Sequence, residues 1–188
     1  MQIKQPPLFN ASKTHIRLAA PLMAESVVDG PGLRTVVWTQ GCCHNCDGCH
    51  NPQTHSFRDG SLYALDELCD KIVELNQNIT LSGGDPALQP EQCLVLAKCA
   101  NENGLNVWMY TGFLFEDLLK SPIHRELFQY VDVLVDGKFD KTKKTSEAKF
   151  RGSSNQRLID VKKSIINQNI VMWTDPMESI NRVRADLF

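Results

Sequence analysis

The chain has 188 residues, of which 42% are hydrophobic and 22% are charged, and its formal net charge is -2. This length is enough for one globular domain with a sizeable core. Lysine and arginine are dispersed along the chain, so neither nucleic acid nor an anionic membrane surface is an expected partner. No apolar segment follows a basic start at the N-terminus, and the longest apolar runs have only the length of a strand. We therefore expect neither a signal peptide nor a membrane span, and a cytoplasmic location.

The first elements are an extension and two candidate strands. Residues 1–14 carry two prolines and little apolar periodicity, which indicates an N-terminal extension, and we expect residues 15–188 to form a single domain. Residues 15–20 alternate loosely between apolar and polar side chains and are a candidate edge strand. The sequence Gly30-Pro31-Gly32 predicts a turn, and the apolar run that follows it predicts a buried strand over residues 33–38.

Helices and strands then alternate along the chain. Apolar residues at helical spacing, with charged residues on the opposite face, predict an amphipathic helix over residues 62–73. In chain order, we next expect a strand over 78–81, a helix over about 87–103, a strand over 105–111, a helical stretch over 114–130 broken at Pro122, a strand over 131–135, candidate strands over 158–161 and 170–173, and an outer helix over 175–188. Such alternation predicts a parallel sheet with right-handed crossovers, either open or closed into part of a barrel.

A cysteine-rich loop directly follows the strand expected over residues 33–38. Four of the chain's seven cysteines fall within eight residues, and Cys42, Cys46 and Cys49 have the spacing C-x3-C-x2-C, with Cys43 outside it. Three thiolates on one short loop can converge on a single metal centre, and thiolates favour iron-sulfur clusters, zinc or copper(I). A 4Fe-4S cluster held by only three cysteines would leave one iron with an open coordination position for chemistry.

Two other interpretations of this loop remain open. A structural zinc site needs four ligands, usually as two separate pairs, and the chain has no second such pair. One of His44, His50 and His55 would have to complete it. A reactive thiol or a disulfide is the third alternative, but four cysteines crowded on one loop fit reduced thiols and a metal better. Cysteines elsewhere in the chain are expected to be buried on helices: Cys69, Cys93 and Cys99.

Other polar motifs also follow expected strands. In the sequence Ser82-Gly83-Gly84-Asp85-Pro86, paired glycines allow close approach to the backbone, and Asp85 can accept a hydrogen bond from an ammonium group or cap the next helix. Asp136 and Lys138 follow the strand over 131–135 and could contact a ligand or form an ion pair. The lysine-rich residues 140–149 are either a solvated loop or a partner-binding loop.

The cysteine loop with its preceding VDGPGLR, together with LSGGDP, VDVLVDGKF and FRGSSNQR, closely resembles the radical S-adenosylmethionine (SAM) activases of anaerobic ribonucleotide reductase. The match spans about residues 15–161. The resemblance implies an α/β fold of the radical SAM type, an open partial (β/α) barrel in which helices lie outside a parallel sheet. It implies one 4Fe-4S cluster on Cys42, Cys46 and Cys49, with SAM bound to the fourth iron. It further implies that the SAM amino group is received by Gly83, Gly84 and Asp85, and that backbone contacts to the cofactor come from Gly48, Cys49 and His50.

The activity implied by this resemblance is that of an oxidoreductase. Reductive cleavage of SAM would produce a 5'-deoxyadenosyl radical, which takes a hydrogen atom from a glycine in the catalytic subunit of anaerobic ribonucleotide reductase. Activation of another glycyl radical enzyme, of the pyruvate formate-lyase type, is an alternative. From a different class, an iron-sulfur electron carrier or a zinc-binding module also remains open. No second cysteine cluster exists in the chain, so an external one-electron donor such as flavodoxin is implied.

Overall fold

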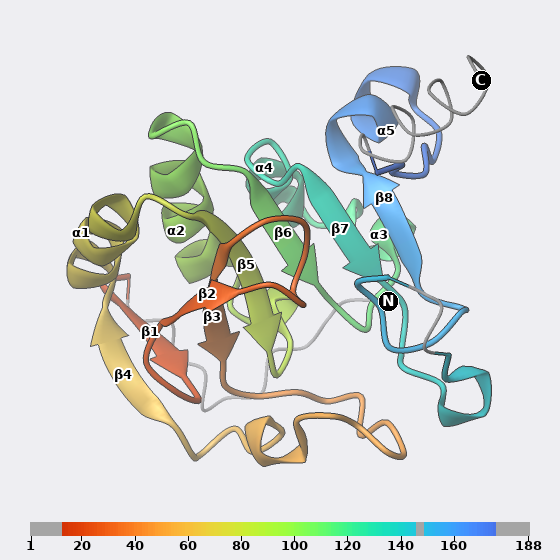
Figure 1. Ribbon diagram of the computed structural model, residues 1–188, viewed down its shortest axis with the longest axis horizontal. Helices are drawn as coiled ribbons and strands as arrows, with labels where there is room; N and C mark the ends of the chain where they lie inside the picture. Colours follow the sequence, from red (N-terminus) through yellow and green to blue (C-terminus); the bar gives the residue numbers. More distant parts are fainter. Residues whose placement is uncertain (1–12, 146–148, 176–188) are drawn as a thin grey trace, which may run out of the picture.

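The computed structural model describes residues 13–145 and 149–175, which form a sheet with helices packed on it (Figure 1). Most of the expected N-terminal extension and most of the expected helix over 175–188 lie outside the described residues. None of the helices in the described part of the chain could span a membrane.

Four parallel strands form the centre of the sheet, and antiparallel strands flank them. The parallel strands are β3 (Arg34–Thr39), β5 (Asn78–Gly83), β6 (Val107–Tyr110) and β7 (Val133–Asp136), adjacent in that order. The antiparallel strands are β1 (His15–Leu18), β2 (Met23–Ser26), β4 (Ser61–Ala64) and β8 (Arg157–Asp160). The strand order β4-β1-β3-β5-β6-β7-β8 has two ends, so the sheet is open (Figure 1). The expected α/β architecture is confirmed, but the sheet is mixed and only its centre is parallel.

The flanking strands correct three expectations. Residues 61–64 form β4 rather than the start of a helix, because their backbone pairs with β1 from His15 to Leu18. The strand expected over 158–161 is β8, and it runs antiparallel to β7, since no helix crosses over the sheet between them. The strand expected over 170–173 is reduced to a single bridge between Met172 and Ile159.

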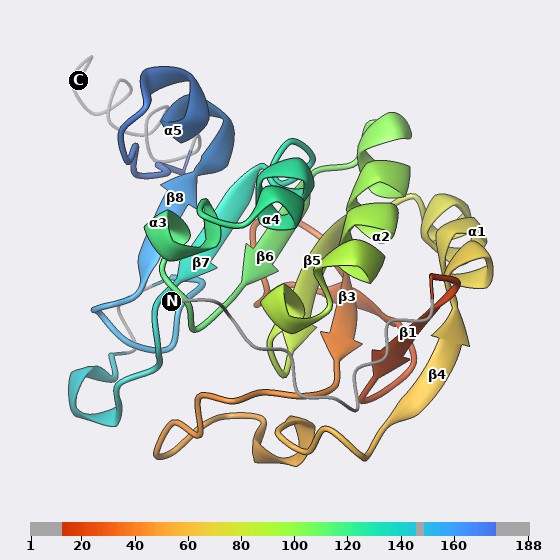
Figure 2. The same cartoon turned by 180° about the vertical axis from the view of Figure 1, so that it is seen from behind.

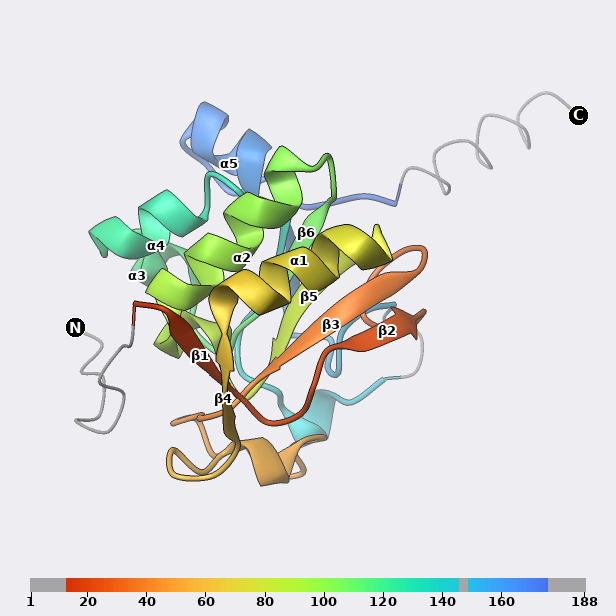
Figure 3. The same ribbon diagram turned by 90° about the vertical axis from the view of Figure 1, so that its left-hand side faces the viewer.

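The helices cover one face of the sheet, which is the near face in Figure 2. They are α1 (Leu65–Leu75), α2 (Pro90–Glu102), the short α3 (Phe115–Leu118) and α4 (Pro122–Leu127), and Figure 3 shows α1 and α2 side by side over the strands. The break expected at Pro122 is confirmed, because this proline begins α4. One helix was not expected from the sequence: α5 (Val161–Asn167) follows β8 directly and is capped by the Asp160 side chain, which accepts a hydrogen bond from the Lys163 amide.

Both faces of the central strands are buried. Along β6, Val107 and Met109 pack into the core beneath the helices, whereas Trp108 between them packs on the opposite face with Phe150 and Trp173. This alternation follows from the two-residue period of a strand, and burial on both faces is usual for parallel strands. Because β3, β5, β6 and β7 are parallel, their C-terminal ends meet at one edge of the sheet, where the cysteine loop also lies (Figure 1).

Candidate metal and cofactor site

The cysteine loop is joined to the loop after β5 by backbone hydrogen bonds. The amide of Gly84 donates to the carbonyl of Thr39 (2.7 Å), and the amide of Asp85 donates to the carbonyl of Gly41 (2.8 Å). A Cβ atom on Gly84 would lie 2.3 Å from the Gly41 oxygen, so only glycine allows the two loops to approach this closely. Glycine at position 83 is required as well, since its φ is +103°. The paired glycines therefore have a structural role, which is to let the two loops lie in close contact.

The three cysteines of the C-x3-C-x2-C spacing are half-buried, whereas Cys43 is exposed. Burial raises the pKa of the Cys42 thiol to about 12. Burial also raises the pKa of Cys46, and the charge of the neighbouring Cys49 adds to this, while the amide of Phe139 and the charge of Lys138 oppose it. The thiols of Cys42 and Cys46 are therefore protonated at neutral pH in the metal-free protein, and a metal must displace their protons when it binds.

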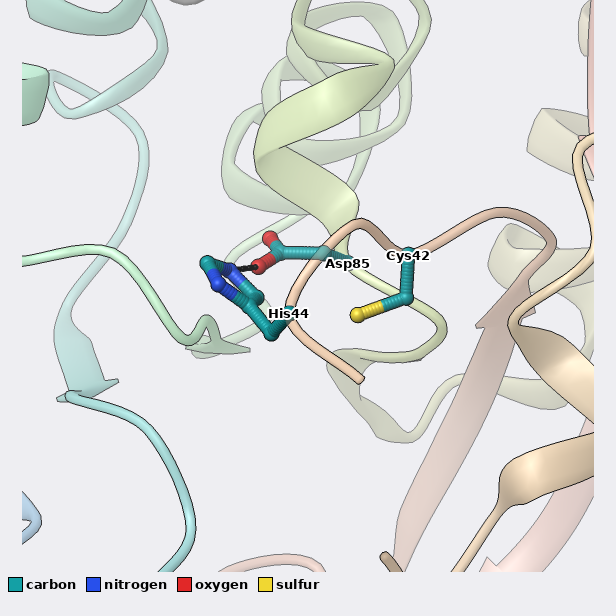
Figure 4. A group of neighbouring side chains, drawn as sticks. All are labelled: Cys42, His44 and Asp85. Atoms are coloured by element: carbon teal, nitrogen blue, oxygen red, sulfur yellow. Dashed lines mark hydrogen bonds and ion pairs between the residues drawn. The ribbon is translucent and has the colours of Figure 1, made fainter. Parts of the chain in front are cut away.

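Asp85 is the most highly connected side chain of the site, and its relative exposure is only 1%. Its Oδ1 accepts hydrogen bonds from the amide of Ala87 (3.0 Å) and the hydroxyl of Thr111 (2.8 Å). Its Oδ2 accepts from the amide of Gly112 (3.0 Å) and from Nε2 of His44 (2.7 Å). The bond from Ala87 caps the short helical turn η2 (Pro86–Leu88). A cap was one of the two roles that the sequence left open for Asp85, but it was expected on the long helix, which begins only at Pro90. Asp85 thus joins the cysteine loop, η2 and the loop after β6. Figure 4 shows its bond to His44.

His44 belongs to this site, although the sequence indicated it only as one candidate zinc ligand. Its side chain is 6% exposed. Its ring packs edge-on against Phe113, with centroids 4.4 Å apart, and a Cβ atom on Gly112 would lie 2.3 Å from its Cδ2 atom. The only sequence signal for this role was its position inside the C-x3-C spacing, which says nothing of Asp85 forty-one residues away.

The other end of the cysteine loop contacts the segment after β7. The ring of His50 packs on Phe139, with centroids 5.0 Å apart, and Nζ of Lys141 lies 3.4 Å from a carboxylate oxygen of Asp47. Between these segments lies an open pocket of about 460 Å³, lined by Asp47, Leu114 and residues 137–142, with Asn155 at its border. The structure therefore places Gly48, Cys49 and His50 beside the lysine-rich loop.

Asp136 and Lys138 take different roles. Asp136 has a relative exposure of 0%, accepts a hydrogen bond from the amide of Phe115 (2.9 Å) and pairs with the guanidinium of Arg157, whose Nε lies 2.8 Å from Oδ1. Arg157 also donates to the carboxylate of Glu116. The ion-pair alternative for Asp136 is thus correct, but its partner comes from β8. Lys138 instead lines the open pocket.

The RGSSNQR sequence, residues 151–157, is hydrogen-bonded to the residues after β7 that line the pocket. The Gln156 side chain accepts hydrogen bonds from the amides of Gly152 (2.9 Å) and Ser153 (3.2 Å), and it donates to the carbonyl of Gly137 (3.1 Å). Asn155 donates to the carbonyl of Lys138 (2.9 Å). These contacts hold the chain after β7 against the chain before β8.

The remaining cysteines lie on α1 and α2. Cys93 is fully buried, as expected, and its pKa is raised by burial. Cys69 and Cys99 are half-buried and adjacent, since the thiol of Cys99 lies 3.8 Å from the carbonyl oxygen of Cys69. The sequence did not indicate that these two would meet.

Comparisons with known proteins agree on one family. The model of a family described as a 4Fe-4S single cluster domain matches residues 28–159. A relative from Enterobacteria phage T4 is 38% identical over 140 residues, which are 70% of this chain and 86% of the relative. A relative from Pasteurella multocida is 33% identical over 145 residues (69% and 89%), and one from Escherichia coli K12 is 32% identical over 142 residues (69% and 90%). All three are named anaerobic ribonucleoside-triphosphate reductase-activating protein.

Proposed function

Because the chain belongs to the family of the anaerobic ribonucleoside-triphosphate reductase-activating proteins, with a 4Fe-4S single cluster domain, we propose that it is a radical SAM enzyme. Its proposed target is the catalytic subunit of anaerobic ribonucleotide reductase. A cytoplasmic location is part of the proposal, because thiols stay reduced there.

The proposed cluster ligands are Cys42, Cys46 and Cys49. Their loop fits a cluster because all three thiols are half-buried and Cys46 lies near the cation of Lys138, which favours its thiolate form. Three ligands leave one iron for SAM. When both are bound, the cluster and SAM supply a one-electron reductive cleavage whose product removes a hydrogen atom from a glycine of the partner protein. Because the other cysteines lie on α1 and α2, an external electron donor such as flavodoxin is required.

The proposed SAM contacts are the backbone of Gly48, Cys49 and His50, and the loop of Gly83, Gly84 and Asp85. An ionised carboxylate has about four lone-pair directions, and Asp85 already uses its own for four donors. Asp85 can therefore receive the SAM amino group only in exchange for one of these donors. Of the four donors, only His44 comes from the cysteine loop. We therefore propose that the SAM amino group replaces the His44 imidazole as a donor to Asp85.

The observation that carries the proposal is the pairing of the cysteine loop with the Ser-Gly-Gly-Asp loop at the C-terminal edge of the parallel strands. At this edge, the open pocket beside Asp47 and Lys138 offers a surface on which a segment of a large partner can dock next to the cysteine loop. The same edge is where α/β folds generally build their active sites.

The test is anaerobic reconstitution followed by electron paramagnetic resonance. We expect about four irons and four sulfides per chain, and a change in the spectrum of the reduced cluster when SAM is added. Adding the reductase subunit with reduced flavodoxin should then produce a glycyl radical signal. A chain that takes up no iron and sulfide even after bound zinc has been removed would support the zinc-binding module. A cluster whose spectrum does not respond to SAM would support the electron carrier. A radical formed on pyruvate formate-lyase, but not on the reductase, would favour the other activase.

A further inference from the structure

Cys42, His44 and Asp85 form a compact group of potential metal ligands. One sulfur, one nitrogen and one oxygen ligand atom from these residues all lie within 4.8 Å of one another. Among residues 13–145 and 149–175, no other group of three such side chains meets this condition. Figure 4 shows the three side chains around one common space, with the thiol of Cys42 directed towards His44 and Asp85.

The side chains of Asp85 and His44, and the backbone of Cys42, are held by contacts that need no metal. The Asp85 carboxylate is fixed by Ala87 and Thr111, and His44 is held between Phe113 and Gly112. The backbone amide of Cys42 donates to the carbonyl of His55 (3.1 Å). Ligands that are positioned in advance lose little conformational entropy on binding, which favours metal affinity.

The donor set indicates which metal would bind. A thiolate, an imidazole and a carboxylate together suit zinc, which accepts all three and often keeps a fourth position open to water when only three protein ligands are present. Calcium and magnesium prefer oxygen ligands alone. Zinc also binds such sites more tightly than ferrous iron does. The short contact between Nε2 of His44 and Oδ2 of Asp85 is bridged by a proton, whose place a divalent cation can take.

We propose that Cys42, His44 and Asp85 bind a single zinc ion in the protein that lacks its iron-sulfur cluster, with water as the fourth ligand. The thiol proton of Cys42 passes to solvent on binding, and His44 binds as a neutral imidazole through Nε2. Cys42 is also a proposed cluster ligand, so zinc and the cluster exclude one another, and zinc blocks cluster assembly. This exclusion rests on the proposed function, whereas the zinc site itself does not.

The experiment uses the full chain without iron or sulfide, titrated anaerobically with Co²⁺ as a coloured substitute for zinc. We expect one cobalt per chain, a charge-transfer band from one thiolate, and loss of both signals when zinc is added. Cys42→Ser, His44→Ala and Gly112→Ala should each weaken cobalt binding by more than about tenfold. Gly112→Ala removes no ligand, but its new Cβ would displace the imidazole. Cys43→Ser, Cys46→Ser and Cys49→Ser should keep the cobalt spectrum.

The two cysteine variants distinguish this site from the proposed cluster site. Cys46→Ser and Cys49→Ser should lose the cluster and keep the cobalt site, and the cobalt measurement stands even if the wild-type chain assembles no cluster. The zinc site is wrong if the wild-type chain binds no cobalt, if His44→Ala binds it unchanged, or if Cys46→Ser or Cys49→Ser loses it. If cobalt binds as expected but zinc-loaded protein still takes up iron and sulfide at the rate of the metal-free protein, mutual exclusion is wrong.

Discussion

Nε2 of His44 lies 2.7 Å from Oδ2 of Asp85, and both side chains are almost completely buried. This bond connects the cysteine loop to the loop after β5 through side chains, in addition to the backbone bonds that join the same loops. A change at His44 should therefore affect the protein even when no metal or cofactor is present.

We expect His44→Leu to lower the free energy of unfolding by about 1–3 kcal/mol, because it leaves the buried carboxylate of Asp85 with one donor fewer. His44→Gln, whose amide can still donate, should lose less. Chemical denaturation of the metal-free protein measures both. Equal losses in the two variants would mean that packing against Phe113, rather than the hydrogen bond, accounts for the stability.

Replacing the cysteines one at a time tests which of them hold the cluster. Cys42→Ala, Cys46→Ala and Cys49→Ala should each abolish SAM cleavage and cluster retention, since each removes one of three proposed ligands. Cys43→Ala should retain most of both, because Cys43 is exposed and lies outside the spacing. Iron content and methionine release measure the two properties. Loss of the cluster in Cys43→Ala alone would require a different set of ligands.

The role of Asp85 can be tested through SAM affinity. Asp85→Asn should weaken SAM binding by roughly 1.5–3 kcal/mol, as expected for loss of a charge-assisted hydrogen bond, without loss of iron. Asp117→Asn is the matched control, since Asp117 lies on α3 and is half exposed beside Lys120. Equilibrium binding of SAM to the reconstituted wild-type and variant proteins measures this affinity. An unchanged affinity would leave Asp85 with its structural contacts only.

Arg157, which contacts both Asp136 and Glu116, should contribute to stability in a pH-dependent way through Glu116. Arg157→Met leaves a fully buried carboxylate without its cation, which should cost about 2–3 kcal/mol of unfolding free energy near pH 7. Hydrogen bonding from Arg157 also holds the pKa of Glu116 below its ordinary value. A depressed carboxylate pKa stabilises the fold above the unfolded pKa, and this contribution disappears as the pH falls through the folded pKa.

The difference in stability between the wild-type chain and Arg157→Met should therefore be largest near neutral pH and shrink below about pH 4. Urea denaturation over a pH series measures it. A difference that stays constant down to pH 3 would show that the lost packing of the arginine side chain, rather than charge, is responsible.

The open pocket should be covered when the partner binds. We expect hydrogen exchange of residues 136–145 and 149–157 to slow when the reductase subunit is added. Residues 137–142 and Asn155 line the pocket beside the cysteine loop, and the chain before β8 is hydrogen-bonded to them. Helix α1 serves as an internal control, since it lies at the other end of the sheet (Figure 1). Unchanged exchange around the pocket, in a complex shown to form, would exclude this surface as the docking site.

Local patterns in the sequence determined much of this protein. The C-x3-C-x2-C spacing, the paired glycines and the strand-helix alternation are properties of neighbouring residues, so they indicated a metal loop, a close backbone contact and an α/β fold without any knowledge of distant contacts. The family indicated by the resemblance of the cysteine loop, VDGPGLR, LSGGDP, VDVLVDGKF and FRGSSNQR was also correct.

The tertiary structure decided what depends on residues far apart in the chain. The antiparallel direction of β8 depends on its pairing with β7, and apolar periodicity is the same for a strand of either direction. The partner of Asp136 could not be chosen between Lys138 and Arg157 from sequence, because both are cations and only the pairing of β7 with β8 brings Arg157 opposite Asp136. His44 and Asp85 meet for the same reason: β3 and β5 are parallel neighbours, so the loops that follow them end at the same edge of the sheet.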